Sequence, residues 1–102
     1  MEQDKITFEE EYHSNGQLRY KYQYLNGEQH GEQLGYYSNG QLRYKRQYLN
    51  GKFHGEQLGY FSDGALKHKY YYINGDGVSY EEWIKYKRNE KLQSIWEKIK
   101  IK

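Results

Sequence analysis

Cysteine is absent from this 102-residue chain, and apolar residues are scarce, at 35% of the sequence with a mean hydropathy of -1.32. Without cysteine, a disulfide framework and thiolate metal sites are excluded. No apolar run approaches the roughly 18 residues that a membrane-spanning helix needs. The N-terminal stretch MEQDKITFEEEY lacks the basic and apolar segments of a secretory signal, so we expect a cytoplasmic protein.

Charge of one sign is also lacking, because the formal net charge is only +2. Residues 1–78 carry 9 Lys or Arg and 10 Asp or Glu, whereas residues 79–102 carry 7 and 4. Aromatic residues are plentiful, with 14 tyrosines in a chain that is 19% aromatic. Disordered chains are poor in aromatics. A folded domain is therefore expected, whose thin core is covered by tyrosine rings with hydroxyls near water.

The heptapeptide HGEQLGY occurs at residues 30–36 and again at 54–60, and the repetition extends beyond it. SNG at 14–16 returns at 38–40 and as SDG at 62–64, and QLRYKYQYLNG at 17–27 returns at 41–51 and, more loosely, at 65–75. Three copies of a 24-residue unit thus begin at Tyr12, Tyr36 and Tyr60, and the third lacks a final His-Gly. Repetition at this period is typical of stacked supersecondary units.

Within each unit the sequence alternates with a period of two, which predicts strands with one covered face. In the first unit Leu18 and three tyrosines point one way, and Gln17, Arg19, Lys21 and Gln23 point the other. Asn-Gly and Asp-Gly dipeptides between the strands favour the positive φ of tight hairpin turns. The expected fold is mainly β, a single-layer antiparallel meander of about six or seven strands over residues 1–78. Gly31, Gly35, Gly55 and Gly59 are expected to permit bends or close strand approach.

Residues 79–102 change to a helical period. Ser79 and Glu82 fit a capping box, and apolar residues recur at three- and four-residue spacing from Trp83 to Ile99. The pair Arg88-Asn89 is a point at which one helix would divide into two. We expect this segment to cap the last rung, which an open repeat array leaves exposed, or to lie across the tyrosine-bearing face. Otherwise its apolar stripe would bind a partner.

The pattern Y-x-S-N-G-x-L-x-x-x-x-x-Y-x-N-G-x-x-H-G resembles the variant form of MORN repeats. The matching positions recur in two copies: Tyr24, Asn26, Gly27, His30, Gly31 and Glu32, then Tyr48, Asn50, Gly51, His54, Gly55 and Glu56. The resemblance covers roughly residues 12–75 and implies about three MORN-like repeats. Residues 79–102 lie outside it, and the C-terminal α-helical cap is expected from their helical period. The resemblance further implies dimerisation, scaffolding or phospholipid binding, and, for short bacterial forms, antitoxins or immunity proteins that inhibit a toxin. These implications are analogies, because a fold does not fix a function.

Catalytic chemistry is not expected, because the chain has no nucleophile elbow, phosphate loop or metal-ligand cluster. His30 and His54 are equivalent positions, so tandem duplication explains them better than a metal site does. Glu32 and Glu56 are expected to be solvated or to form cross-strand ion pairs. We therefore predict a non-enzymatic chain with no cofactor and no metal.

Nucleic acid is not an expected partner, because alternation places tyrosines and most cations on opposite faces. The tail is basic and has an apolar side formed by Ile95, Trp96, Ile99 and Ile101, and such a helix can lie on anionic lipid. A small repeat domain needs the same apolar side for its cap, so capping is favoured and a lipid-associating scaffold is the alternative. A homodimeric array is a third possibility. The leading hypothesis is a stoichiometric inhibitor, antitoxin-like, of a bacterial, phage or giant-virus system, acting in the cytoplasm of a bacterium or an infected cell. Its partner would be a protein, such as a toxin or host enzyme.

The expected binding surface is the tyrosine-bearing face, since tyrosine and arginine are enriched in binding hot spots. Arg46 falls in line with the tyrosines, where it would stack on them or protrude toward a partner. The candidate partner-binding residues are Tyr20, Tyr22, Tyr24, Tyr44, Arg46, Tyr48, His68 and Tyr70.

Overall fold

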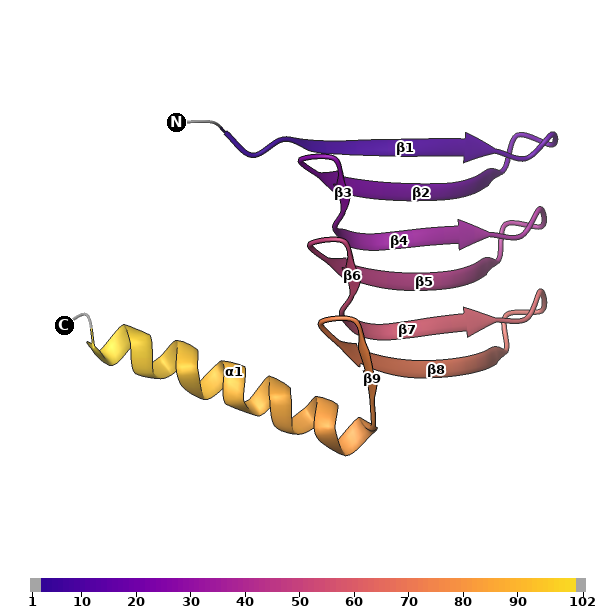
Figure 1. Ribbon diagram of the computed structural model, residues 1–102. Coiled ribbons are helices and arrows are strands. Elements are labelled where there is room, and N and C mark those ends of the chain that lie inside the picture. The colour runs from indigo at the N-terminus through magenta and orange to yellow at the C-terminus, as the bar shows by residue number, and fades with distance from the viewer. Residues whose placement is uncertain (1–2, 101–102) are drawn as a thin grey trace.

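The computed structural model describes residues 3–100 as one antiparallel sheet followed by one helix (Figure 1). Seven strands follow one another across the sheet in the order β1-β2-β4-β5-β7-β8-β9, and the two-residue strands β3 and β6 pair with β2 and β5. The predicted single-layer meander is confirmed, and the two short strands add to the expected six or seven. The elements are β1 (Ile6–Tyr12), β2 (Leu18–Leu25), β3 (Glu28–Gln29), β4 (Gly31–Tyr36), β5 (Leu42–Leu49), β6 (Lys52–Phe53), β7 (Gly55–Tyr60), β8 (Leu66–Ile73), β9 (Asp76–Val78) and α1 (Tyr80–Lys100).

The turns fall into two classes, which the sequence did not distinguish. Asn26, Asn50 and Asn74 have φ near 50° and each precedes a glycine with positive φ, as two-residue hairpin loops require. In the turns at the other ends of the strands, only the glycine of each Asn-Gly or Asp-Gly pair has positive φ. There Asn15 Oδ1 accepts a hydrogen bond from Gln17 N, and its Nδ2 donates to Ser38 O of the next repeat at 2.7 Å. The asparagine of these turns therefore both shapes its own loop and joins it to the next one.

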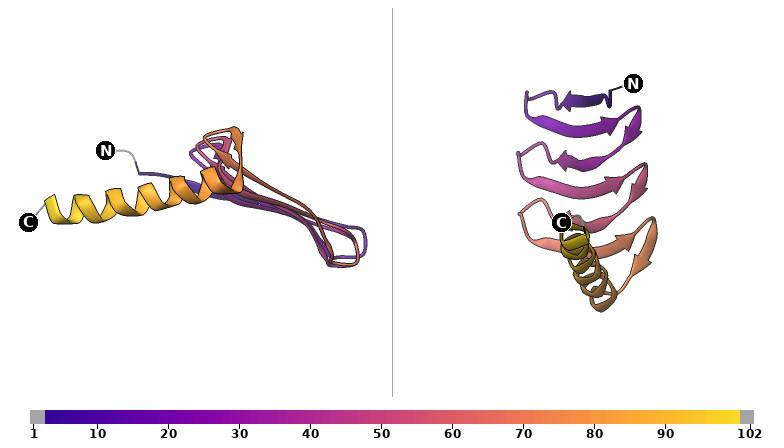
Figure 2. Two further views of the ribbon diagram at one scale, coloured as in Figure 1. Left: turned by 90° about the horizontal axis from the view of Figure 1, so that it is seen from below. Right: turned by 90° about the vertical axis from the view of Figure 1, so that its left-hand side faces the viewer.

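The first two repeats bend where histidine and glycine meet. Gly31 and Gly55 have φ of 81° and 104°, so the chain leaves the short strand and re-enters the sheet at an angle. As a result β2 and β4 share only the pairs Tyr20–Gly35 and Lys21–Leu34. The predicted bends at these glycines are thus observed. The sheet has a bent profile when it is viewed along the stack (Figure 2, left).

Glutamine side chains replace the strand pairing that the bend removes. Gln33 Oε1 accepts from Gln23 N at 2.9 Å and Gln33 Nε2 donates to Gln23 O at 2.8 Å, so its amide acts as a peptide group of the missing strand. Gln57 does the same with Gln47. These two glutamines are 1% and 6% exposed, and no apolar side chain among residues 3–100 is fully buried. The expected tyrosine core is therefore wrong. A single layer has nothing to cover its rings, so the tyrosines stay partly or fully exposed.

The C-terminal segment is one helix of 21 residues, without a break at Arg88-Asn89. The predicted N-cap is present, because Ser79 Oγ accepts from Glu82 N at 3.1 Å. The helix contains neither glycine nor proline, so nothing in its sequence interrupts it. No helix in the described part of the chain is long and apolar enough to cross a membrane.

The first two turns of α1 pack against the sheet. Trp83 and Tyr86 pack edge-on against His54, and Trp83 stacks with Tyr71, with ring centroids 5.4–6.4 Å apart. The helix thus caps the last repeats and then projects beyond the strand ends (Figures 1 and 2). It does not lie across the tyrosine-bearing face, because Tyr71 points to the other side. The stripe Leu92, Ile95, Trp96 and Ile99 is exposed, which corrects the expectation that capping would cover it. Ile101 lies outside the described residues.

Candidate functional site

The tyrosine face, defined as the side of the sheet that carries the eight candidate partner-binding residues, is organised in stacked pairs. Tyr20 stacks on Tyr22 with ring centroids 4.3 Å apart, and His68 stacks on Tyr70 at 5.1 Å. In the middle repeat Arg46 takes the place of the second ring, with its Cζ 4.1 Å from the centroid of Tyr44. The predicted stacking of Arg46 is confirmed.

Glycines make room for these upright side chains. Tyr44 lies beside Gly35 and His68 beside Gly59 in the strand register, and a Cβ on either glycine would overlap the neighbouring ring. Close approach, predicted from the sequence for Gly35 and Gly59, is therefore observed. Because these positions lack side chains, the rings of Tyr44 and His68 can lie directly over the backbone of the neighbouring strand.

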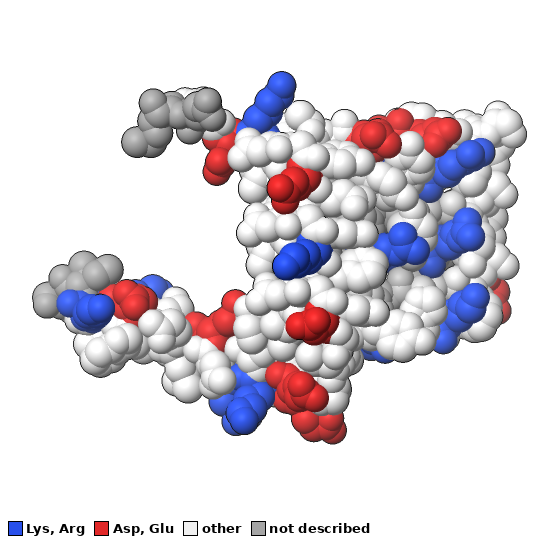
Figure 3. Space-filling model, in the orientation of Figure 1, with Lys and Arg blue, Asp and Glu red and all other residues white. Residues whose placement is uncertain are grey.

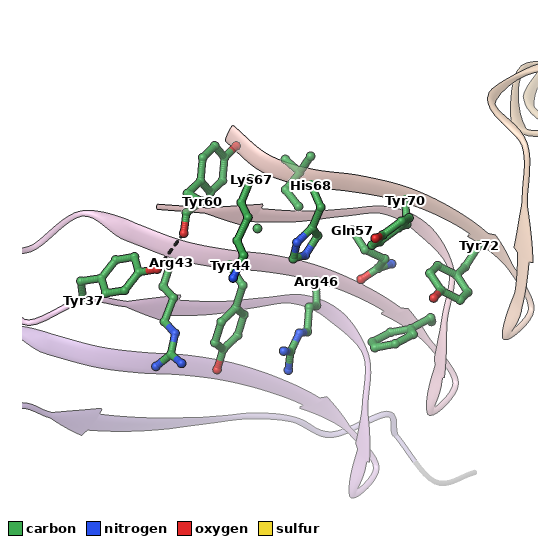
Figure 4. Close-up of a pocket in the computed structure, with 13 residues that line it drawn as sticks. Tyr37, Arg43, Tyr44, Arg46, Gln57, Tyr60, Lys67, His68, Tyr70 and Tyr72 are labelled. Atoms are coloured by element: carbon green, nitrogen blue, oxygen red, sulfur yellow. Dashed lines mark hydrogen bonds between the residues drawn. The ribbon is translucent and has the colours of Figure 1, made fainter. Parts of the chain in front are cut away.

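A hollow on this face, here called the trough, has a volume of about 370 Å³ (Figure 4). Phe53 forms one wall, packed between Tyr48 and Tyr72 with ring centroids 4.9 and 5.1 Å apart. The opposite wall contains Tyr37, whose hydroxyl donates to Tyr60 O at 2.8 Å. The residues that line the trough are Tyr37, Arg43, Tyr44, Arg46, Phe53, Gln57, Leu58, Gly59, Tyr60, Lys67, His68, Tyr70 and Tyr72.

Four of the eight candidate residues line the trough together: Tyr44, Arg46, His68 and Tyr70. Tyr20 lines a neighbouring hollow with Arg19, Arg43 and Tyr44, and the hydroxyl of Tyr22 is hydrogen-bonded to that of Tyr44. Tyr48 supports the wall through Phe53. Tyr24 is half-buried at the N-terminal end of this surface and does not line the trough.

Three cations lie on the tyrosine face although the sequence alternation predicted them on the opposite face. Each repeat has a β-bulge at which one residue has no partner on the adjacent strand, and this residue is Arg19, Arg43 or Lys67. A bulge re-aims a side chain, which explains why Arg43 and Lys67 line the trough beside tyrosines. The expectation that cations and tyrosines lie on opposite faces is therefore wrong at these positions. The repeated Leu-Arg or Leu-Lys pair after each turn was the available signal.

The reverse side, here called the ion-pair face, pairs its charges across strands. Lys21, Lys45 and Lys69 lie 4.0, 3.2 and 3.5 Å from Glu10, Glu32 and Glu56. The predicted cross-strand ion pairs of Glu32 and Glu56 are thus present. Glu56 raises the pKa of Lys69 through its negative charge.

Hydrogen bonding and burial also shift tyrosine acidity on the tyrosine face. The pKa of Tyr20 is raised because its hydroxyl donates to Glu9 Oε1 at 2.9 Å. Burial raises the pKa of Tyr22, and its bond to the Tyr44 hydroxyl adds to the shift. These phenols are therefore neutral hydrogen-bonding groups at ordinary pH.

The histidines join successive repeats through hydrogen bonds. His30 Nδ1 accepts from Asn50 N at 3.2 Å, and His54 Nδ1 accepts from Asn74 N at 3.1 Å. Both rings therefore occupy equivalent structural positions, one repeat apart. Within residues 3–100 no group of three or more His, Cys, Asp or Glu side chains is arranged to hold a metal ion.

A family model for the MORN repeat variant matches residues 9–26, 29–50 and 53–74. These matches cover more than half of the chain, which therefore belongs to the MORN repeat variant family. A search of curated proteins and a search of solved structures give no match. MORN repeats are non-catalytic modules that generally bind proteins or membranes.

Proposed function

We propose that this chain is a non-enzymatic module that binds a protein partner through the tyrosine face and inhibits it by stoichiometric occlusion, as an antitoxin or immunity protein does. The observation that carries the proposal is the trough, where Tyr44, Arg46 and Tyr70 converge without a catalytic arrangement. Tyrosine and arginine are the side chains that most often dominate binding energy at protein interfaces. The proposed location is the cytoplasm of a bacterium or an infected host cell.

The shape of the surface supports a protein partner. The trough is open along the tyrosine face (Figure 4), and its walls present ring edges, hydroxyls and guanidinium groups. Such groups combine apolar contact with hydrogen bonding at low conformational cost, since a tyrosine has few rotatable bonds. Stacking of Arg46 on Tyr44 also fixes the guanidinium before a partner arrives, which reduces the entropy lost on binding.

Affinity capture from the native host tests the proposal, with the full chain as bait and an Arg46→Glu, Tyr48→Ala double variant beside it. One protein should be retained at a one-to-one ratio by the native chain and lost by the variant. A Glu32→Gln, Lys45→Gln variant on the ion-pair face is the matched control and should keep the partner. Equal capture by the native chain and by the Arg46→Glu, Tyr48→Ala variant would contradict the proposal, as would turnover of a substrate by the purified protein.

A second candidate function is association with anionic membrane through α1. It is favoured by the exposed stripe Leu92, Ile95, Trp96 and Ile99, which lies next to Lys91, Lys98 and Lys100 in the sequence. A basic helix with an exposed apolar side can lie on anionic lipid. Sedimentation with phosphatidylserine vesicles tests this function, because binding should vanish in high salt and on removal of residues 89–102. A homodimeric array, the third candidate, would show twice the monomer mass in solution.

A further inference from the structure

The cations of the two faces differ in whether they have a carboxylate partner. Lys21, Lys45 and Lys69 on the ion-pair face each lie within 4.0 Å of a glutamate. Among residues 3–100, by contrast, Arg43, Arg46 and Lys67 of the trough form no ion pair. Their charges are instead held over aromatic rings, those of Tyr37, Tyr44 and Phe61. The trough therefore carries positive charge that the chain itself does not neutralise.

The first strand carries two acidic residues of the tyrosine face, Glu9 and Glu11. Glu11 pairs with Arg19 at 4.0 Å, and Glu9 accepts the hydroxyl of Tyr20. In the two later repeats Gln33 and Gly35, and then Gln57 and Gly59, occupy the positions of these glutamates. In Figure 3, red side chains line the top edge at the right and blue ones are gathered below them, while further red side chains lie toward the left of the same face.

Several aromatic rings of the trough have one face occupied by a neighbouring side chain. Arg46 lies over Tyr44, His68 and Tyr70 stack on each other while both remain exposed, and Phe53 lies between Tyr48 and Tyr72. Proteins that bind single-stranded nucleic acid stack successive bases on free aromatic faces. The tyrosine face offers instead ring edges, hydroxyls and three fixed cations, which suit carboxylates and peptide groups.

We propose that the trough binds an acidic segment of the partner protein, whose carboxylates meet Arg43, Arg46 and Lys67. This inference rests on the proposed function and names the chemistry of the partner at the same site. Charge-assisted hydrogen bonds from guanidinium to carboxylate are among the strongest that side chains form. The tyrosine hydroxyls around the trough supply further hydrogen-bond donors for the same carboxylates.

The repeat spacing sets the spacing of the acidic residues. Arg43 on β5 and Lys67 on β8 hold equivalent places in successive repeats, with β7 between their strands. Two strand spacings amount to about 9.6 Å. Seven residues of an α-helix span about 10.5 Å. A helical partner segment would therefore carry Asp or Glu seven residues apart, with a further acidic residue between them for Arg46.

Selection from a random displayed peptide library tests the inference, with the full chain as bait and an Arg43→Gln, Arg46→Gln, Lys67→Gln variant in a parallel selection. Peptides enriched by the native chain alone should be rich in Asp and Glu. The best of them should bind the glutamine variant about tenfold more weakly or worse, a loss of about 1.4 kcal/mol or more. The matched control, Lys21→Gln, Lys45→Gln, Lys69→Gln, should change its affinity less than about twofold. Thermal unfolding of both variants verifies that each is folded.

Enriched peptides without an excess of acidic residues, or equal binding by the native chain and the trough variant, would overturn the inference. Oligothymidylate and phosphatidylserine vesicles are titrated alongside. If either binds through the three cations more tightly than the acidic peptide, the trough is a phosphate site and the inference fails. In host-cell capture, the partner could be lost by Arg46→Glu, Tyr48→Ala but kept by Arg43→Gln, Arg46→Gln, Lys67→Gln. That result would support the proposed function and contradict the acidic segment. Absence of any captured partner would count against the proposed function instead.

Discussion

The two faces of this sheet are built from the same strands but use their charges differently. On the ion-pair face, every repeat sets a lysine opposite a glutamate of the neighbouring strand, as in Lys45–Glu32 and Lys69–Glu56. On the tyrosine face, Arg43, Arg46 and Lys67 rest on aromatic rings, and no carboxylate within residues 3–100 pairs with them. The lysines of the ion-pair face are paired with carboxylates of the chain itself, whereas the three trough cations of the tyrosine face are not.

A small feature of the backbone creates this difference. Without the bulges, strict alternation would place Arg19, Arg43 and Lys67 on the ion-pair face. The extra residue at each bulge brings the cation to the side of the following tyrosine or histidine. One additional residue per repeat thus converts an aromatic surface into an aromatic and cationic one.

The largest expected effect on stability comes from replacing a buried glutamine, whose side-chain amide pairs with the backbone of the neighbouring strand. Gln33→Ala leaves Gln23 N and O without their partners and should lower the free energy of unfolding by about 2–6 kcal/mol, at about 1–3 kcal/mol for each unsatisfied group. Urea denaturation measures the loss. Gln93→Ala, which removes an exposed glutamine on α1, is the control and should change stability by less than about 0.5 kcal/mol. Equal effects of the two changes would mean that the glutamine pairing does not hold the repeats together.

A methyl group under a ring of the tyrosine face should have the next largest effect. Gly35→Ala places a Cβ against the Tyr44 ring and should cost about 1–3 kcal/mol as the ring is displaced. Gly77→Ala is the matched control, because its Cβ would meet Tyr72 at an ordinary 3.7 Å. Thermal unfolding followed by circular dichroism compares them, and a neutral Gly35→Ala would show that Tyr44 is not fixed.

Alkaline pH should weaken both faces for the same thermodynamic reason. Tyr20 and Tyr22 have pKa values raised above the ordinary 10.0, and Lys69 has one raised above 10.5. A raised pKa in the folded state stabilises the protein below the unfolded pKa, and this contribution is lost as pH rises through the folded value. The free energy of unfolding should therefore decline above about pH 10. Urea denaturation at several pH values should show that the free energy of unfolding declines less steeply for Tyr22→Phe than for the native chain. An unchanged slope would show that Tyr22 does not contribute to the decline.

Neutralising a single cation separates the two faces. Lys45→Gln breaks an exposed ion pair and should cost about 0.2–1 kcal/mol of stability. Arg46→Gln should leave stability within about 0.5 kcal/mol and weaken partner binding instead. Urea denaturation and affinity measurements on both variants test these statements. A larger loss of stability for Arg46→Gln than for Lys45→Gln would show that the cation of the tyrosine face, and not that of the ion-pair face, stabilises the fold.

Ending the chain at Glu90 should have the smallest effect on the sheet. Residues 91–100 are exposed along their whole length, whereas Trp83 and Tyr86, which contact His54, would remain. The unfolding midpoint of the sheet should therefore be nearly unchanged. Trp83→Ala provides the contrast and should lower it, and the opposite ranking would show that the distal helix supports the fold.

The repeat and its strands could be predicted from the sequence because period, alternation and Asn-Gly turns all favoured the same fold. The cap at Ser79 was also predictable, since its hydrogen bond is local. Burial was not predictable by residue type: Gln33 and Gln57 look like solvent-facing strand residues, and their role depends on the bend at the preceding glycine. Their recurrence inside HGEQLGY was the only trace of that role in the sequence.

The candidate site was predicted in part. Tyr44, Arg46, His68 and Tyr70 meet in the trough because alternation holds between the bulges. Arg43 and Lys67 were assigned to the wrong side, since a bulge depends on pairing between strands and leaves no mark on periodicity. Phe53 was missed because its two-residue strand is too short to show a pattern.

Capture of the native partner by two matched triple variants tests the difference between the faces most directly. The account predicts that Arg43→Gln, Arg46→Gln, Lys67→Gln loses the partner, and that Lys21→Gln, Lys45→Gln, Lys69→Gln retains it at the native ratio. Both variants remove three positive charges, so a general charge effect would weaken them equally. Retention by the trough variant together with loss by the ion-pair variant would contradict the account and assign binding to the other face.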